Sequence, residues 1–275
     1  MENAFFDINS MLEDDLFYEY LDKISSPDVP LSEKKKCLKK AKAIHPDDLE
    51  LAMISTDLET DDPIKKLGMY DLAIKKEEEK LEKDGFFKEY MGEFWLAFET
   101  RPYMRALMEK SELLRFLGRT LDAISLSERM LELNNNDNLG VRYNLMTLYA
   151  LMIDEAKAKD LYAKYKEESA FMLLPFAILY FRVGKYKECD KVLEKIKNMN
   201  TYLLAMIESG DFLVYEDEEC PPFYSIGSYE EALCVVDENR SLLKSQIGFL
   251  IYLKNKSSKM PKEQNKKARS NIKKS

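Results

Sequence analysis

The stretch Arg105–Asp137 reads RALMEKSELLRFLGRTLDAISLSERMLELNNND, and it decides the fold class. Apolar residues recur at helical spacing on both sides of Gly118-Arg119, and an Asn-rich break follows the second run. This pattern is typical of two amphipathic helices joined by a tight turn, because glycine ends helices readily and asparagine favours loops. The stretch therefore predicts a helix-turn-helix pair.

The same plan recurs twice downstream. Residues 139–168 repeat it with a turn near Asp154 that lacks glycine, and residues 171–200 repeat it with Gly184 in the turn. At spacings of 35 and 31 residues, the second helices of the three pairs begin with small side chains: Ala123, Ala158 and Cys189. These spacings straddle the period of about 34 residues found in tetratricopeptide repeats, and small side chains let paired helices approach closely. We therefore expect an all-α, tetratricopeptide-like solenoid of helix pairs.

The rest of the chain is expected to extend and close this array. We divide it into an N-terminal helical region with a degenerate repeat (1–92), three helix pairs (93–200), C-terminal capping helices (201–254) and a disordered basic tail (255–275). Within the first region, Pro63–Asp84 is predicted to be one amphipathic helix, with Leu72 and Ala73 on or near its apolar face.

Charge separates the tail from the body. The chain has a net charge of −8, but residues 255–275 hold eight Lys or Arg and one Glu, which leaves −15 on the body. Sequence-independent binding to nucleic acid or an anionic membrane needs clustered positive charge, so only the tail suits nucleic acid. The longest apolar run, 171–181, is too short to span a bilayer, and the chain begins without a basic signal region. We expect a cytoplasmic protein that binds no membrane.

No arrangement of residues indicates catalysis, a metal or a cofactor. The single histidine, His45, stands before Pro46 in a break between helices, and the acidic pairs fall at helix starts and in loops. The four cysteines are widely spread without a CxxC pair, so reduced, buried thiols are expected. The sequence therefore predicts a protein that is not an enzyme and needs no cofactor.

A family resemblance rests on two stretches. FWLAFETRPYMR at 94–105, followed by the GRTLDAI turn, resembles bacterial tetratricopeptide-like proteins related to the suppressor-of-tumorigenicity-seven family. The segment PPFYSIGSYEEALCVVDENRSLLKSQIGFLIYL at 221–253 is similar to the part that closes those proteins. Asn135 departs from the pattern, since a proline is usual there. The resemblance implies the fold much more than a function, and it implies no catalytic residue.

The string ETRPYMR carries the sharpest candidate site. Thr100 can cap a helix that has Pro102 in its first turn, and Arg101 and Arg105 then share a helical face with Tyr103 close by. Such a site favours an anion or a peptide carboxylate, because guanidinium groups and a helix N-terminus both attract negative charge. The alternative is that Glu99 or acidic residues of a neighbouring helix pair with these arginines.

In a tetratricopeptide solenoid the first helix of each pair lines the concave surface. The residues expected to bind a partner there are Arg101, Tyr103, Arg105, Met108, Glu112, Arg115, Arg142 and Tyr143. The sequence therefore favours a protein- or peptide-binding scaffold. The alternative function is a regulator of nucleic acid transactions whose basic tail contacts DNA or RNA.

Overall fold

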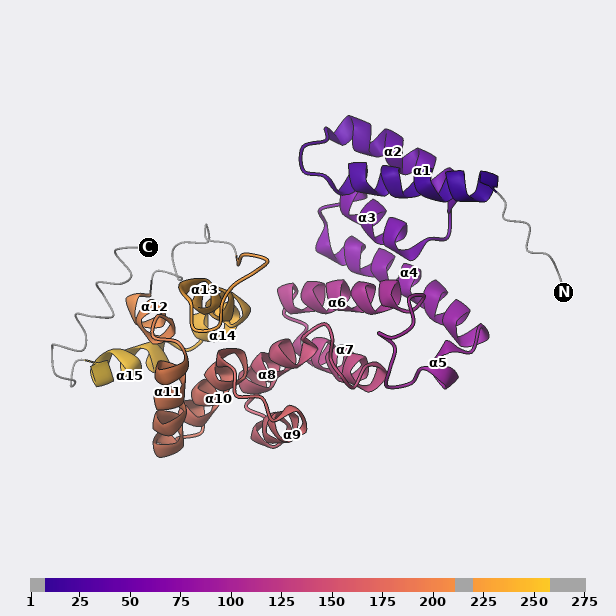
Figure 1. The fold of residues 1–275 in the computed structure, drawn as a ribbon. Coiled ribbons are helices and arrows are strands. Elements are labelled where there is room, and N and C mark those ends of the chain that lie inside the picture. Colours follow the sequence, from indigo (N-terminus) through magenta and orange to yellow (C-terminus); the bar gives the residue numbers. More distant parts are fainter. Residues whose placement is uncertain (1–7, 211–219, 258–275) are drawn as a thin grey trace. The chain divides into compact units, whose positions relative to one another are not determined.

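The computed structural model describes residues 8–210 and 220–257, which form helices joined by turns and loops (Figure 1). The predicted all-α class is confirmed, since these two ranges hold fifteen helices and no strand. The β-type pairing in them is one isolated bridge between Glu93 and Asn134. The chain divides into two compact units, residues 1–138 and 139–275. The boundary falls inside the stretch expected to hold three consecutive helix pairs.

Unit 1 is built from helices that pack against their neighbours in the chain. Helix α1 packs on α2, α3 contacts both α2 and α4, and α6 contacts α3, α4 and α7. The bounds are α1 (Ile8–Ser25), α2 (Leu31–Ile44), α3 (Leu49–Glu59), α4 (Pro63–Lys83), α5 (Phe86–Glu89), α6 (Arg101–Phe116) and α7 (Thr120–Leu133). The helix expected from Pro63 is α4, whereas α1 and α5 lie in the region expected to be helical but were not predicted individually.

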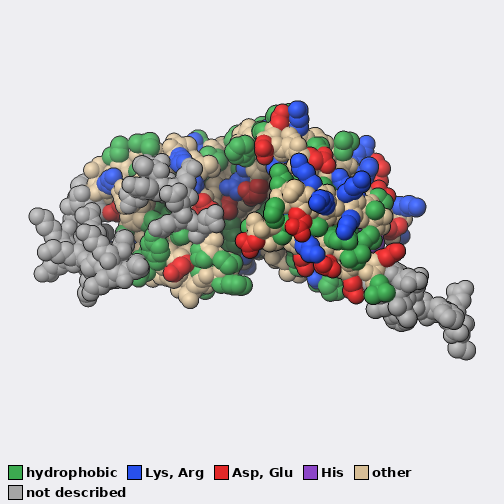
Figure 2. Space-filling model, turned by 90° about the horizontal axis from the view of Figure 1, so that it is seen from above, with side chains coloured by type: hydrophobic (Ala, Val, Ile, Leu, Met, Phe, Trp, Pro, Cys, Tyr) green, Lys and Arg blue, Asp and Glu red, His purple; other side chains and the backbone are tan. Residues whose placement is uncertain are grey.

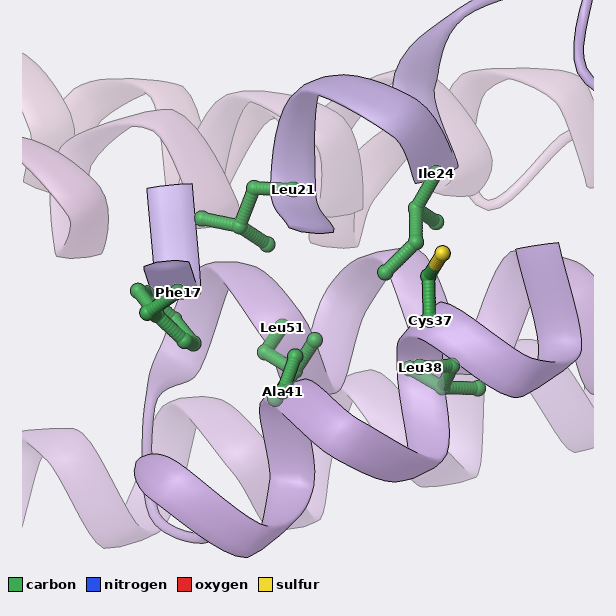
Figure 3. Close-up of a cluster of buried hydrophobic side chains, with 7 residues drawn as sticks. All are labelled: Phe17, Leu21, Ile24, Cys37, Leu38, Ala41 and Leu51. Carbon is green, nitrogen blue, oxygen red and sulfur yellow. The ribbon is translucent and has the colours of Figure 1, made fainter. Parts of the chain in front are cut away.

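The first core of unit 1 lies between α1, α2 and α3. Its side chains on α1 and α2 recur every three or four residues, as an amphipathic stripe requires, and α3 adds one. Figure 3 shows the seven that converge there: Phe17, Leu21, Ile24, Cys37, Leu38, Ala41 and Leu51. Ala41 is fully buried, and so small a side chain lets the helix backbones approach closely.

Acidic residues fix the starts of α3 and α4. The side chain of Asp48 accepts a hydrogen bond from the backbone N–H of Leu51, and that of Asp62 accepts from Ile64 and Lys65. Each cap satisfies N–H groups that have no partner inside the helix. The expectation that these acidic pairs mark helix starts is confirmed here.

Unit 2 is organised around one buried helix. Helix α10 contacts α8, α9, α11 and α13, and nine of its residues between Ala170 and Leu179 are buried. The bounds are α8 (Val141–Met152), α9 (Glu155–Tyr165), α10 (Ala170–Arg182), α11 (Tyr186–Met199), α12 (Leu203–Ser209), α13 (Tyr229–Glu238), α14 (Arg240–Lys244) and α15 (Ile247–Ser257). Most of the apolar run from residue 171 therefore serves as the core of this unit.

The turns inside the three expected helix pairs share one hydrogen-bond pattern. The N–H of Arg119 donates to the carbonyl of Leu114 (2.9 Å), and the equivalent bonds run from Asp154 to Tyr149 and from Lys185 to Tyr180. The residue before each donor has a positive φ, as the Schellman ending of a helix requires: Gly118 (70°), Ile153 (59°) and Gly184 (74°). The second turn therefore keeps the geometry of the other two without their glycine.

The expectation that all four cysteines are reduced is wrong. Cys220 and Cys234 form a disulfide, while Cys37 and Cys189 are free and buried. The two bonded cysteines are 14 positions apart, so no local motif signals the pair. The bond forms because the loop that begins at Cys220 folds back onto α13, which carries Cys234.

The predicted C-terminal tail lies mostly outside the described residues. Helix α15 continues to Ser257, so 255–257 are helical, and nothing further is described from 258 to 275. Residues 211–219, which belong to the region 201–254 expected to hold capping helices, also lie outside the described ranges. Among the helices that are described, none has the length and apolar character needed to cross a membrane.

Candidate functional site

Thr100 does not cap α6. Its Oγ1 donates hydrogen bonds to the carbonyls of Phe94 and Ala97, the latter at 3.0 Å, and Thr100 itself is fully buried. A hydroxyl that points back into the preceding turn cannot also accept from the first N–H groups of the helix. The predicted cap is therefore wrong, and the residue holds the segment before α6 instead.

Arg101 is engaged by the same segment. Its Nε donates to the carbonyl of Trp95 at 2.9 Å, and the guanidinium lies 4.1 Å from the ring centre of Phe98 and 5.5 Å from that of Trp95. A hydrogen bond and two cation–π contacts hold this side chain in place. Phe98 is nevertheless 74% exposed, so one apolar ring beside Arg101 remains open to solvent.

Arg105 points to a different partner. Its Nη2 lies 3.1 Å from Oε2 of Glu50, which is on α3. The two arginines therefore do not converge on one anion site. The geometry matches the alternative that an acidic residue of a neighbouring helix pairs with an arginine.

Tyr103 belongs to the core. It is 3% exposed, and its ring lies 6.0 Å from Phe87 and 6.2 Å from Phe94. Burial raises the pKa of Tyr103, and the neighbouring Glu78 adds to this effect. This side chain is not available to a partner in this structure.

The remaining predicted residues of unit 1 lie further along α6. Glu112 and Arg115 form an ion pair one turn apart, with Nη1 of Arg115 3.0 Å from Oε2 of Glu112. Met108 is partly buried on the same helix. The Glu112 side chain is half exposed, whereas that of Arg115 is only 16% exposed, and the ion pair already satisfies part of each charge.

Arg142 and Tyr143 form a network in unit 2 with a residue that the sequence did not indicate. Nε of Arg142 donates to Glu167 at 2.7 Å, its Nη2 donates to the Tyr143 hydroxyl at 2.6 Å, and that hydroxyl donates to Glu167 at 2.7 Å. The guanidinium also lies 4.2 Å from the Tyr143 ring centre. The structure thus joins these two predicted residues and closes them onto Glu167.

The electrostatics of this network favour an ionised Glu167. Burial alone raises its pKa, but the hydrogen bonds from Tyr143, Arg142 and Ser169 together hold the pKa below its usual value. Burial raises the pKa of Tyr143, and its hydrogen bond to Glu167 adds to the rise. The network is therefore a neutral tyrosine and an ion pair, a stable arrangement rather than a poised acid–base pair.

A hollow of unit 1 lies elsewhere, between α3 and α4. It has a volume of about 490 Å³, with the end of α2 closing one part of it. Small and apolar side chains form much of its lining: Leu49, Leu51, Ala52, Ser55, Thr56, Met69, Leu72 and Ala73. We call this hollow the α3–α4 groove. Leu72 is 67% exposed there, although the sequence placed it on or near the apolar face of its helix.

Charged residues of both signs surround the groove. Lys42 donates to Ser55 at 2.6 Å and contacts Glu59 at 3.3 Å, while the buried Ser55 hydroxyl donates to Glu59 at 2.6 Å. The hydrogen bond from Ser55 holds the pKa of Glu59 below its usual value, and Lys42 adds to this effect. Lys76, Lys80, Asp47 and Glu77 line other parts of the groove. An apolar floor surrounded by polar and charged side chains is typical of a surface that binds another protein.

Sequence reasoning missed the groove because its floor comes from two helices. The stripe on α3 recurs as Leu49, Ala52, Ser55 and Thr56, and the stripe on α4 as Met69, Leu72 and Ala73. Each stripe alone looks like an ordinary buried face. Only their packing shows that small side chains leave the space between them open.

No protein-family model, curated protein or solved structure shows significant similarity to this chain. The candidate site therefore rests on its own geometry. Within residues 8–210 and 220–257, no three His, Cys, Asp or Glu side chains are grouped so as to hold a metal ion.

Proposed function

We propose that this protein is a non-catalytic binding protein whose α3–α4 groove holds an amphipathic helix of a protein partner. The observation that carries the proposal is the groove itself, whose floor is apolar and includes the two-thirds exposed Leu72. Grooves between helices commonly bind the apolar face of another helix, which presents side chains at helical spacing. Small residues such as Ala52 and Ala73 allow a close approach.

The dimensions of the groove support a helical ligand. Its α3 lining runs from Asp48 to Glu59, which at 1.5 Å per residue is roughly 16 Å, or about three helical turns. The rim carries lysines as well as acidic residues, and Figure 2 shows both signs interspersed over the visible surface. A mixed rim suits a partner with mixed charges better than it suits nucleic acid, which needs clustered positive charge.

We further propose that the helix pairs α6–α7, α8–α9 and α10–α11 are tetratricopeptide-like units. The shared turn hydrogen bonds support this, as do the spacings of the small residues at Ala123, Ala158 and Cys189. The resemblance to proteins related to the suppressor-of-tumorigenicity-seven family is part of the same proposal. Repeat proteins of this kind act mostly by binding, which agrees with the proposed role of the groove.

Site-specific photo-crosslinking tests the groove. A photoreactive phenylalanine at Leu72 in the full chain is expected to crosslink to a partner in source-cell lysate, and mass spectrometry then identifies the attached peptide. That peptide should have an amphipathic helical pattern. Adding Ala73→Arg should abolish the crosslink, because a long charged side chain fills the floor.

The matched controls use Ala43, an exposed residue of α2 that does not line the groove. The photoreactive residue at Ala43 should capture none of the same protein, and Ala43→Arg should leave the Leu72 crosslink intact. Identical crosslinks from both positions would refute the proposal. A crosslink that disappears after nuclease treatment would instead favour the regulator of nucleic acid transactions.

A further inference from the structure

A second, smaller hollow lies in unit 2 between α9, α10 and α11. Its volume is about 190 Å³, below the range of pockets that hold drug-sized ligands. Its apolar lining is Leu173, Phe176 and Val192, and the rings of Tyr162 and Tyr180 stand edge-on to Phe176 at 5.5 and 5.3 Å. We call it the aromatic slot. Its size and lining suit one apolar side chain.

Two lysines from different helices line the mouth of the slot, Lys159 on α9 and Lys195 on α11. The chain's own Glu168, from the connection between α9 and α10, forms an ion pair with Lys195, and the Tyr162 hydroxyl donates to the same carboxylate at 3.4 Å. These contacts hold the pKa of Glu168 below its usual value, the bond to Lys195 contributing most. Lys195 and Tyr162 at the mouth of the slot thus already bind one carboxylate, that of Glu168.

This internal carboxylate is replaceable. The side chains of Lys195 and Glu168 are 51% and 56% exposed, and ion pairs between such exposed groups add little stability. Glu155, which pairs with both Lys159 and Lys185, is only 20% exposed and is held more firmly. An incoming carboxylate would therefore exchange with Glu168 more easily than with Glu155.

We propose that the aromatic slot binds one apolar side chain of an acidic peptide segment, and that a neighbouring carboxylate of this segment replaces Glu168 on Lys195 and Tyr162. The slot excludes water from the apolar side chain, and Lys195 selects the acidic flank. This inference concerns a different unit from the α3–α4 groove. Either proposal can therefore fail without the other.

The first test uses a synthetic peptide. Fluorescein-labelled Gly-Ser-Asp-Glu-Leu-Asp-Glu-Ser-Gly is titrated with the full chain, and binding is followed by fluorescence anisotropy. Replacing the peptide's Leu with Ala should weaken binding about tenfold, because most of the buried apolar area is lost. Replacing Asp and Glu with Asn and Gln should weaken binding several-fold and remove its salt dependence.

Variants of the protein locate the binding. Val192→Arg fills the slot and should abolish binding, and Lys195→Gln should weaken it about two- to fivefold. Glu168→Gln removes the internal competitor and should strengthen binding by about the same factor. Glu194→Gln, an equal charge change at an exposed position of α11, should have no such effect.

Several results would overturn the inference. These are no binding at about millimolar protein, equal binding of the Leu and Ala peptides, or binding that survives Val192→Arg. Equal gains from Glu168→Gln and Glu194→Gln would show a general charge effect in place of a defined carboxylate site. Circular dichroism of each variant checks that the helices are intact, and Glu168→Gln remains decisive because it predicts a gain.

Discussion

Glu167 accepts hydrogen bonds from two side chains that the sequence analysis assigned to partner binding. Arg142 and Tyr143 are adjacent in the chain, so their proximity was predictable, but Glu167 lies 25 residues beyond Arg142. Its contribution depends on how the α9–α10 connection folds against α8, which no local pattern specifies. The arginine is also only 17% exposed in its side chain, so the network is part of the fold before it can be part of a binding surface.

The pH dependence of stability tests whether Glu167 is ionised in this network. Its folded-state pKa is held below the usual value, mainly by hydrogen bonds from Tyr143 and Arg142 that outweigh its burial. The stabilisation is therefore present above the unfolded pKa of about 4.3 and is lost as pH falls through the folded value. We expect Glu167→Gln to cost about 1–2 kcal/mol of unfolding free energy at pH 7 and much less near pH 3.

Urea unfolding at pH 7, 5 and 3 measures this difference. Glu194→Gln, which removes an exposed carboxylate of the same unit, is the control and should cost little at any of these values. A deficit for Glu167→Gln that is the same at every pH would contradict the ionised network. It would indicate loss of packing instead.

At the ETRPYMR string, the sequence predicted the helix but not the contacts of its side chains. The spacing of Arg101 and Arg105 placed both on α6, which the structure bears out. Their partners could not be predicted, because Trp95 offers a backbone carbonyl and Glu50 belongs to α3. Tyr103 looked available because the sequence does not show that Phe87, on α5, lies against it.

The turn between α8 and α9 has the same backbone geometry as the other two turns, although a residue other than glycine occupies its left-handed position. Ile153 adopts φ 59° where the equivalent residues of the other two pairs are Gly118 and Gly184. A β-branched side chain in this left-handed region carries a conformational cost of about 1–2 kcal/mol. The turn forms nevertheless, because Asp154 still donates to Tyr149 and caps α9 through its side chain.

Replacing this residue should stabilise the protein. Ile153 is 45% exposed, so Ile153→Gly loses part of a buried side chain while it relieves the left-handed backbone. After the extra entropy of glycine in the unfolded chain, we expect a gain of about 0.5–1 kcal/mol, measured by thermal or urea unfolding. Gly118→Ala, the opposite change at the matching turn, should lower stability by about 1 kcal/mol or more. A loss of stability in both variants would show that the Ile153 side chain contributes more than its backbone costs.

The elements themselves were largely predictable where apolar periodicity and turn residues agreed. Helices α4, α6, α7, α10 and α11 have those signals, and they form where expected. Helix α1 was missed because its apolar stripe of Phe17, Leu21 and Ile24 is diluted by acidic residues, and only packing on α2 gives it a buried face. The Cys220–Cys234 disulfide was missed because the two cysteines are 14 positions apart, and a loop has to fold back onto α13 to bring them together.

The division of the molecule into two units was not visible in the repeat pattern. The three helix pairs continue across the boundary at Asn138, while the contacts that hold helices together gather on either side of it. Unit 1 has its core around Leu51, and unit 2 has its core along α10. Sequence periodicity predicts that neighbouring helices pair, but it does not predict which of these pairs share a hydrophobic core.

Core truncations in each unit should therefore have local effects. Leu51 and Leu174 are 1% and 0% exposed, and replacing either with Ala is expected to cost about 2–5 kcal/mol within its own core. Amide hydrogen exchange reports such losses segment by segment, because each region opens with its own free energy. Leu51→Ala should speed exchange in α1, α2 and α3 far more than in α10, and Leu174→Ala should do the reverse. If either variant accelerated exchange equally in both units, the two cores would behave as one cooperative structure.

A helix bound in the α3–α4 groove should protect unit 1 alone, since the side chains that line this groove all belong to that unit.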